Sequence, residues 1–143
     1  MKHVLVAIDF SPQADRVLAT ATELAGALGA DVTILHVAAP DPDFVGFEVG
    51  PQSVRDNRAQ VLESEHRELH RIALRLRDDG IPARAFLFAG ATAEKILEEA
   101  SARGADLIVM GTHGRSGLAS ALLGSTSRAV LHGAACPVVV VPA

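Results

Sequence analysis

The chain has 143 residues, the usual size of one domain, and no change in composition marks a second one. Asp and Glu outnumber Lys and Arg by 17 to 13, and this formal net charge of −4 argues against nonspecific binding to nucleic acid or anionic lipid, which need a basic surface. The single cysteine excludes an internal disulfide, and no apolar run resembles a signal peptide or a membrane span, so we expect a cytoplasmic protein.

Nine segments alternate between strand and helix patterns. Short apolar runs predict strands, and longer segments with apolar residues every three or four positions predict helices. In chain order these are the strand 4–8, the helix 12–28, the strand 32–37, the helix 53–79, the strand 83–88, the helix 93–103, the strand 106–110, the helix 125–133 and the strand 137–141. Such strict alternation indicates one α/β domain, residues 1–143, with a parallel five-stranded sheet covered by helices on both faces.

Small and polar residues mark the expected ends of these elements. Ser11, followed by Pro12, and Thr92 are expected to be helix N-caps, because their hydroxyls can accept a bond from a first-turn amide. Gly29 stands where glycine commonly ends a helix. Residues 38–52, rich in Pro and Gly, are expected to form a long loop of the kind that often serves as a lid or binding loop.

The expected ligand site lies at the carboxyl ends of the strands, where open parallel sheets bind their ligands. Candidate polar residues there are Asp9 and Ser11, and the segment 111–127, which has the sequence GTHGRSGLASALLGSTS. Its glycines can adopt positive φ and let backbone amides approach an anion, and the helix that begins at Ser125 has unpaired first-turn amides. This predicts a phosphate site; the alternative is a glycine-rich loop in which Ser125 merely caps the helix.

Two common phosphate motifs do not fit this segment. The only lysines, Lys2 and Lys95, lie outside it, which excludes a Walker A loop, and Gly111-x-x-Gly114 differs from the dinucleotide-binding pattern G-x-G-x-x-G. We also find no compelling Ser-His-Asp order and no general base placed for a γ-phosphate. Fast hydrolysis is therefore not expected, and no catalytic residue is assigned.

With these features the chain resembles the nucleotide-binding group of the universal stress proteins. The resemblance covers essentially all residues and rests on VLVAIDFS, ILHV, GADLIVMGTHGRSGLASALLGSTSRAVL and CPVVVV. Within the third of these, the pattern G-x2-G-x9-G-S matches without gaps. The resemblance implies a Rossmann-like sheet with the strand order 3-2-1-4-5, ATP binding and a dimer.

The resemblance also implies how the residues divide between the two ends of the nucleotide. Asp9 and the backbone of Val37 would hold the adenosine end; an acidic residue suits ribose hydroxyls and would repel phosphates. The alternative for Asp9 is a cap at the end of the strand or a bond to the backbone of Ser11. Met110, together with the glycines and hydroxyls of the motif, would surround the ribose and phosphates. The complete set of candidate contacts is Ala7, Asp9, Ser11, Val37, Met110, Gly111, His113, Gly114, Arg115, Gly124, Ser125, Thr126 and Ser127.

ATP is the expected ligand, with ADP and AMP as alternatives. Arg115 and Arg128 are the only cations near the motif, so either the backbone and a Mg²⁺ ion hold the triphosphate or its affinity is modest. The resulting prediction is an ATP-binding regulatory module of the stress response. The alternatives are a slow ATPase or autophosphorylating protein that uses the hydroxyls of residues 125–127, and an interaction subunit in which the nucleotide is structural.

Three other features have plainer interpretations. His66 and His70 share a helix face and could bind zinc, but their charged neighbours favour a solvated face, so no metal site is predicted. His36 is expected in the core or at a sheet edge. Cys136 is expected to be a small buried hydrophobic residue.

The last strand, Val138 to Val141, is apolar and expected at a sheet edge. Unpaired apolar edges invite association, and a two-fold axis would pair this strand with its own copy. The sequence therefore predicts a homodimer through this edge; the alternative is that Pro142 and the short length already protect the edge.

Overall fold

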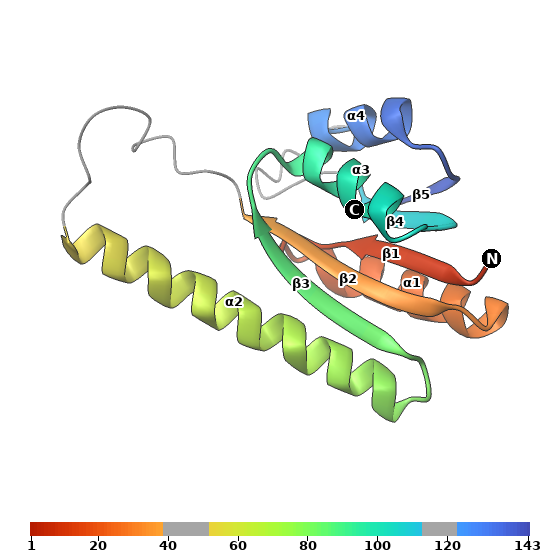
Figure 1. Ribbon diagram of the computed structural model, residues 1–143, viewed down its shortest axis with the longest axis horizontal. Coiled ribbons are helices and arrows are strands. Elements are labelled where there is room, and N and C mark those ends of the chain that lie inside the picture. The colour runs from red at the N-terminus through yellow and green to blue at the C-terminus, as the bar shows by residue number, and fades with distance from the viewer. Residues whose placement is uncertain (39–51, 113–122) are drawn as a thin grey trace.

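The structure is a computed structural model that describes residues 1–38, 52–112 and 123–143 (Figure 1). Five parallel strands form one sheet in the order β3-β2-β1-β4-β5. The strands are β1 (His3–Ala7), β2 (Asp31–Ala38), β3 (Ala83–Ala89), β4 (Leu107–Gly111) and β5 (Val138–Val141). The α/β class and the expected strand order are therefore confirmed, and β5 is an edge strand as predicted.

Four helices cover the sheet: α1 (Ala14–Leu28), α2 (Gln52–Asp78), α3 (Thr92–Ala102) and α4 (Ser125–Gly133). Alternating strand residues divide the core into two layers. Val4 and Val6 of β1 face buried residues of α1 and α2, whereas Leu5 faces buried residues of α3 and α4. Helices therefore lie on both faces of the sheet, as the continuous apolar strands predicted (Figure 1).

The two expected N-caps are wrong. Ser11 precedes α1 by three residues, and the N-cap of α1 is Gln13, in helical conformation and without a side-chain capping bond. Thr92 is the first residue of α3, after Ala91 at the N-cap, again without a side-chain capping bond. The expected end of α1 is confirmed, since Gly29 adopts a left-handed conformation with φ 62°.

The apolar side of α2 is buried only toward its C-terminal end. Leu69, Ile72 and Leu76 are buried against the sheet, but Val61, expected on the same stripe, is 46% exposed. Figure 1 shows the first turns of α2 extending past the end of β3, so no strand lies beneath them. The expected loop over residues 38–52 falls almost entirely outside the described residues.

No helix in the described ranges is both long and apolar enough to cross a membrane.

Candidate functional site

The carboxyl ends of β4 and β5 and the start of α4 are joined by backbone hydrogen bonds. The amide of Thr112 donates to the carbonyl of Val141 over 3.1 Å, and the amide of Gly124 donates to the carbonyl of Thr112 over 2.8 Å. The N-terminus of α4 is thereby fixed beside the end of β4, although the chain between them is long. Of the expected contacts, His113, Gly114 and Arg115 lie outside the described residues.

The first turn of α4 offers backbone donors. Gly124 is its N-cap, with φ −64° and ψ 163°, and no side chain of the described residues caps the helix. The first amides of an α-helix have no partner within the helix, and its dipole favours negative charge there. Ser125 is exposed and Thr126 is half-buried, so this turn can present both amides and hydroxyls to an anion.

Ser127 has a different role from the one expected for it. Its side chain is 2% exposed, and its hydroxyl donates to the carbonyl of Gly111 over 2.8 Å and to that of Thr112 over 3.1 Å. A hydroxyl has a single proton, which these two carbonyls already share. Ser127 therefore fastens α4 to the end of β4, and the hydroxyl donors available in this turn are those of Ser125 and Thr126.

The segment after β1 forms a tight polar turn. Asp9 Oδ1 accepts a hydrogen bond from the backbone amide of Ser11 over 3.0 Å, which is the bond that the alternative interpretation of Asp9 expected. This bond stabilises the turn. Phe10 between them has φ 57°, a conformation that is rare for a residue with a side chain. The Oγ of Ser11 is buried and has no hydrogen-bond partner among the described residues. A buried hydroxyl without a partner is unusual and suits a position that a ligand completes.

Three further residues that were expected to contact the ligand lie at or near the carboxyl ends of strands. Ala7 is the last residue of β1 and is half-buried, Val37 lies near the end of β2, and Met110 precedes the last residue of β4. Val37 and Met110 are 8% and 4% exposed, so they offer a ligand mainly their backbone and a small apolar surface.

Gly111 is required by packing against Gln13, not by positive φ. Among the described glycines, those with positive φ are Gly29, Gly80, Gly90 and Gly104, so the expectation for Gly111 is wrong. A Cβ at Gly111 would lie 2.7 Å from the Gln13 Oε1 atom. Gln13 is held there because its Nε2 donates to the carbonyl of Val141 over 2.6 Å and to Thr112 Oγ1 over 3.3 Å. No sequence signal pointed to Gln13, which is far from Gly111 along the chain.

We expect Gly111→Ala to lower the free energy of unfolding by about 1–2 kcal/mol, because the new methyl group displaces Gln13 from the Val141 carbonyl. In a Gln13→Ala background the same substitution should cost much less. Urea unfolding of the two single variants and the double variant measures this coupling. Strictly additive losses would show that Gln13 does not restrict residue 111.

His36 links α2 to the end of β1. It is 2% exposed, as its expected core position required; its Nδ1 lies 2.8 Å from the carbonyl of Ile8, and its Nε2 lies 3.1 Å from Glu65 Oε2. The ring of Phe10 packs edge-on against it, with centroids 4.8 Å apart. Glu65 was not singled out from the sequence, because it is 29 positions from His36 and only the fold brings them together.

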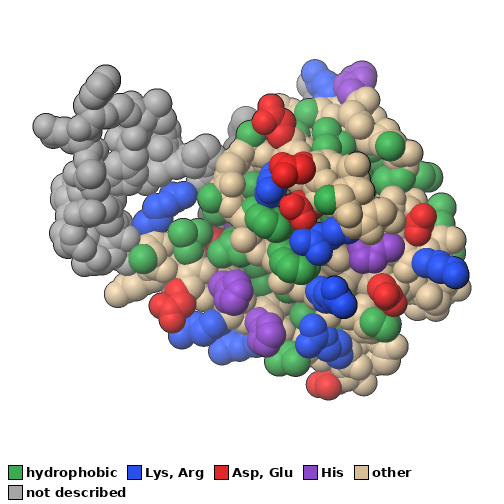
Figure 2. All heavy atoms as spheres, viewed as in Figure 1, with side chains coloured by type: hydrophobic (Ala, Val, Ile, Leu, Met, Phe, Trp, Pro, Cys, Tyr) green, Lys and Arg blue, Asp and Glu red, His purple; other side chains and the backbone are tan. Residues whose placement is uncertain are grey.

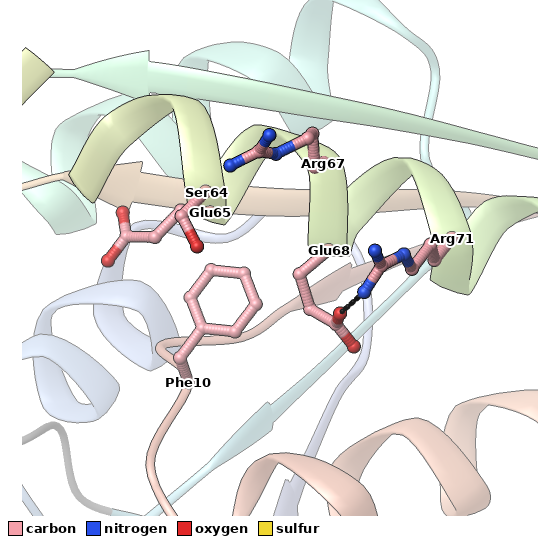
Figure 3. A pocket seen from close by; sticks show the side chains of 6 residues that line it. All are labelled: Phe10, Ser64, Glu65, Arg67, Glu68 and Arg71. Carbon is pink, nitrogen blue, oxygen red and sulfur yellow. Dashed lines mark hydrogen bonds and ion pairs between the residues drawn. The ribbon is translucent and has the colours of Figure 1, made fainter. Parts of the chain in front are cut away.

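A pocket of about 520 Å³ adjoins this link (Figure 3). Its lining residues are Phe10, Ser64, Glu65, Arg67, Glu68 and Arg71. Arg71 is paired with Glu68 over 3.5 Å, as the dashed line in Figure 3 marks. Two carboxylates and two guanidinium groups leave the pocket without net charge, so it exerts no general attraction on a phosphate.

The other side chains that the sequence singled out, two histidines and a cysteine, are exposed or lie away from the carboxyl ends of the strands. His66 and His70 are both exposed, and the described residues contain no group of three or more metal-binding side chains. Cys136 is half-buried, less than expected; burial, and secondarily the charge of Asp106, raises the pKa of its thiol. The pKa of Asp106 is lowered by hydrogen bonds from the amides of Lys2 and His3.

Comparison with known proteins gives matches along the whole chain. The model of the universal stress protein family matches residues 1–142. Universal stress protein A homolog 1 of Coxiella burnetii is 37% identical over 143 residues, which cover 98% of this chain and 95% of that protein. A universal stress protein of Thermus aquaticus is also 37% identical over 143 residues and is covered to 98%, as is this chain.

Solved structures share the fold. The protein MJ0577 superposes with a TM-score of 0.82 at 27% identity, covering 99% of this chain and 96% of that one. A universal stress protein solved in complex with cAMP has a TM-score of 0.70 at 24% identity, with coverage of 98% and 96%. One from Archaeoglobus fulgidus, solved in complex with dAMP, has a TM-score of 0.63 at 22% identity, with coverage of 98% and 97%.

Proposed function

This chain belongs to the universal stress protein family, and we propose that it is a cytoplasmic, ATP-binding regulatory module of the stress response. The nucleotide would lie at the carboxyl ends of the strands. Its phosphates would contact the first turn of α4, and its adenosine end would lie toward Asp9 and the backbone of Val37. ADP and AMP remain alternative ligands of the same site.

The observation that carries this proposal is the N-terminus of α4, which no side chain of the described residues caps and which is held beside the end of β4. Gly124 leaves the approach to the first-turn amides clear of a side chain of its own, and Ser125 and Thr126 add hydroxyl donors. The motif G-x2-G-x9-G-S ends at this turn. Because these donors are mostly backbone groups, a Mg²⁺ ion is the natural partner for the charge of a triphosphate.

Two further observations support the adenosine end of the proposal. The Ser11 Oγ lacks a partner among the described residues, which is accounted for if a ligand group completes the turn after β1. The fold is shared with the two proteins solved with cAMP and dAMP, so a sheet of this kind can hold an adenine nucleotide. At 24% and 22% identity these likenesses bear on the fold, and the residue assignments rest on this chain.

A phosphoryl-accepting role would be restricted to part of the motif. Ser127 is buried and bonded to two carbonyls, so Ser125 and Thr126 are the hydroxyls that a bound γ-phosphate could reach. Incubation with γ-labelled ATP separates the two functions. Persistent label on Ser125 or Thr126, or steady phosphate release, would favour the enzymatic alternative over a binding module.

The apolar edge at β5 supports a homodimer. Val138, Val139 and Val140 are only partly buried in the single chain, and β4 pairs with one side of this strand. Pairing with the same strand of a second copy would cover both its backbone groups and its side chains. Sedimentation at micromolar concentration should show a dimer, and a monomer throughout a dilution series would contradict this arrangement.

The direct test is mass spectrometry of the purified, denatured protein, which should release adenine nucleotide. After the nucleotide has been removed, ATP at 100 times its Kd should stabilise the fold by about 2.7 kcal/mol, which a melting experiment detects. GTP is the matched control, because it carries the same phosphates on a different base. Equal stabilisation by both would contradict an adenine-specific site, and stabilisation by neither would contradict the proposal.

Asp9→Ala should weaken binding of ATP much more than binding of inorganic triphosphate. A carboxylate can accept hydrogen bonds from ribose hydroxyls but repels phosphates, so its loss affects the adenosine end. Calorimetry with both ligands measures the difference, which we expect to be about ten-fold or more, as for a bond to a charged group. Parallel losses for the two ligands would place Asp9 outside the adenosine contacts, with a role only in the turn to Ser11.

A further inference from the structure

A second polar groove lies at the amino ends of the strands, where β1, β2 and β3 begin. Its volume is about 690 Å³, within the range of small-molecule clefts. The side chains that give it its chemistry are His3, Asp31, Thr33, Arg77, Arg84 and Arg103. Because the strands are parallel, this groove is a full strand length away from the candidate nucleotide site.

Three arginines converge on this groove from three elements. Arg77 comes from the end of α2, Arg84 from β3, and Arg103 from the C-terminal cap of α3. Figure 2 shows several Lys and Arg side chains on this face of the molecule, with acidic and His side chains among them. In a chain with a formal net charge of −4, three arginines facing one lining carboxylate, Asp31, make the groove a local reversal of charge.

Two of these guanidinium groups are held in place by the protein. Arg77 donates a hydrogen bond from its Nε to the carbonyl of Ala83 over 2.7 Å. This bond does not use the two terminal nitrogens of the guanidinium group. Arg103 donates its Nε to Glu99 over 2.8 Å and lies 3.8 Å from the centroid of the Phe86 ring. Bonding through Nε and stacking fix the planes of both groups before any ligand arrives.

Arg84 is the third cation, and its side chain is exposed. That side chain makes no hydrogen bond or ion pair with any residue in the described ranges, whereas the backbone of Arg84 pairs with β2. The acidic neighbours are Asp31, which also lines the groove, and Glu99, which divides its charge between Arg103 and Lys95 at 3.5 Å. Cations therefore remain in excess in the groove.

The groove also has a polar wall that is already ordered. Thr33 is 1% exposed, and its Oγ1 lies 2.9 Å from the Nε2 of His3. This pair is held between β1 and β2, and both residues line the groove.

We propose that this groove binds a small, phosphate-bearing anion with at least two negative charges. The planar forks of arginine match the oxygen atoms of a phosphate in pairs, and two of the three forks are already oriented. The ligand would contact Arg84 and the terminal nitrogens of Arg77 and Arg103, with Thr33 and His3 beside it. The inference is independent of the nucleotide site, because it uses none of the residues at the carboxyl ends of the strands.

The test is an NMR titration of ¹⁵N-labelled protein with inorganic pyrophosphate, which measures binding at the groove and at the start of α4 separately. Amides of Val32, Ala83 and Arg84 should shift and saturate in the millimolar range or below. Arg84→Gln should weaken this saturation about ten-fold or more, the loss typical of a bond to a charged group. Saturation at the amides of Ser125 and Thr126, if pyrophosphate also binds there, should be unchanged.

Arg16→Gln is the matched control, because Arg16 is an exposed arginine on α1 that lies outside the groove and carries the same charge. It should leave pyrophosphate binding at the groove unchanged. Arg84→Lys keeps the charge without the fork and should give an intermediate loss. Equal losses in Arg16→Gln and Arg84→Gln would show an effect of net charge alone. That result, the absence of saturable shifts, or citrate binding as tight as pyrophosphate would each overturn the proposal.

Discussion

Replacing Gly124 by valine is expected to abolish adenine-nucleotide binding while the sheet stays folded. Gly124 is the N-cap of α4, and its extended backbone, with φ −64°, is open to residues with side chains. The added isopropyl group would stand at the entrance to the first-turn amides and keep phosphate oxygens away from them. Calorimetry with ATP should therefore show no measurable heat, whereas the circular dichroism of the variant should match the parent.

Gly26→Val is the control for this experiment. Gly26 lies in α1 and is exposed, and a Cβ added to it would meet no atom within 4 Å, so the same substitution there should leave ATP affinity unchanged. Gly124→Ala provides a smaller change in case valine disturbs α4. ATP binding by Gly124→Val with the affinity of the parent would show that the start of α4 is not the phosphate site.

Leu5→Ala is expected to give a large loss of stability. Leu5 is fully buried at the centre of the sheet, where it packs with Leu35 and Ile108 beneath α3 and α4. Truncation of a buried leucine costs about 2–5 kcal/mol, because transfer energy is lost and the cavity collapses only partly. Against a total stability of about 5–15 kcal/mol, this loss should be obvious as a shift of the urea midpoint.

Leu74→Ala is the matched comparison, since it removes the same atoms from a leucine that is 45% exposed on α2. Its urea midpoint should lie close to that of the parent, within about 0.5 kcal/mol in free energy. If the two variants lost similar free energy, the layer beneath α3 and α4 would be less tightly packed than the burial of Leu5 indicates.

The proposed nucleotide site and the arginine groove are at opposite ends of the strands. Leu5 and its neighbours lie between them, so both sites depend on the same buried layer. Measuring the affinities of Leu5→Ala for ATP and for pyrophosphate under folding conditions would show whether binding at either site depends on the stability of the core. The Arg84→Gln and Gly124→Val variants then separate the two sites, because neither touches that layer.

The architecture could be predicted from the sequence because it depends on local patterns. Apolar runs such as Val4 to Val6 need burial on both faces, and their strict alternation with amphipathic segments leaves few arrangements other than a parallel sheet between helices. The left-handed turn at Gly29 is likewise a local property of the chain. The strand order followed from the resemblance to a family, since periodicity alone does not set the order of parallel strands.

The roles of individual site residues were decided by tertiary contacts. Ser127 has a side chain that could donate a hydrogen bond to a phosphate, but the fold places its hydroxyl against the carbonyls of Gly111 and Thr112. Gly111 is needed because Gln13 lies against it. Arg77, Arg84 and Arg103 line one groove only because α2 and α3 end where β3 begins. Residue type and spacing determine which element forms and what chemistry it carries. The partner of each side chain depends on segments distant in sequence, whose positions only the packed structure sets.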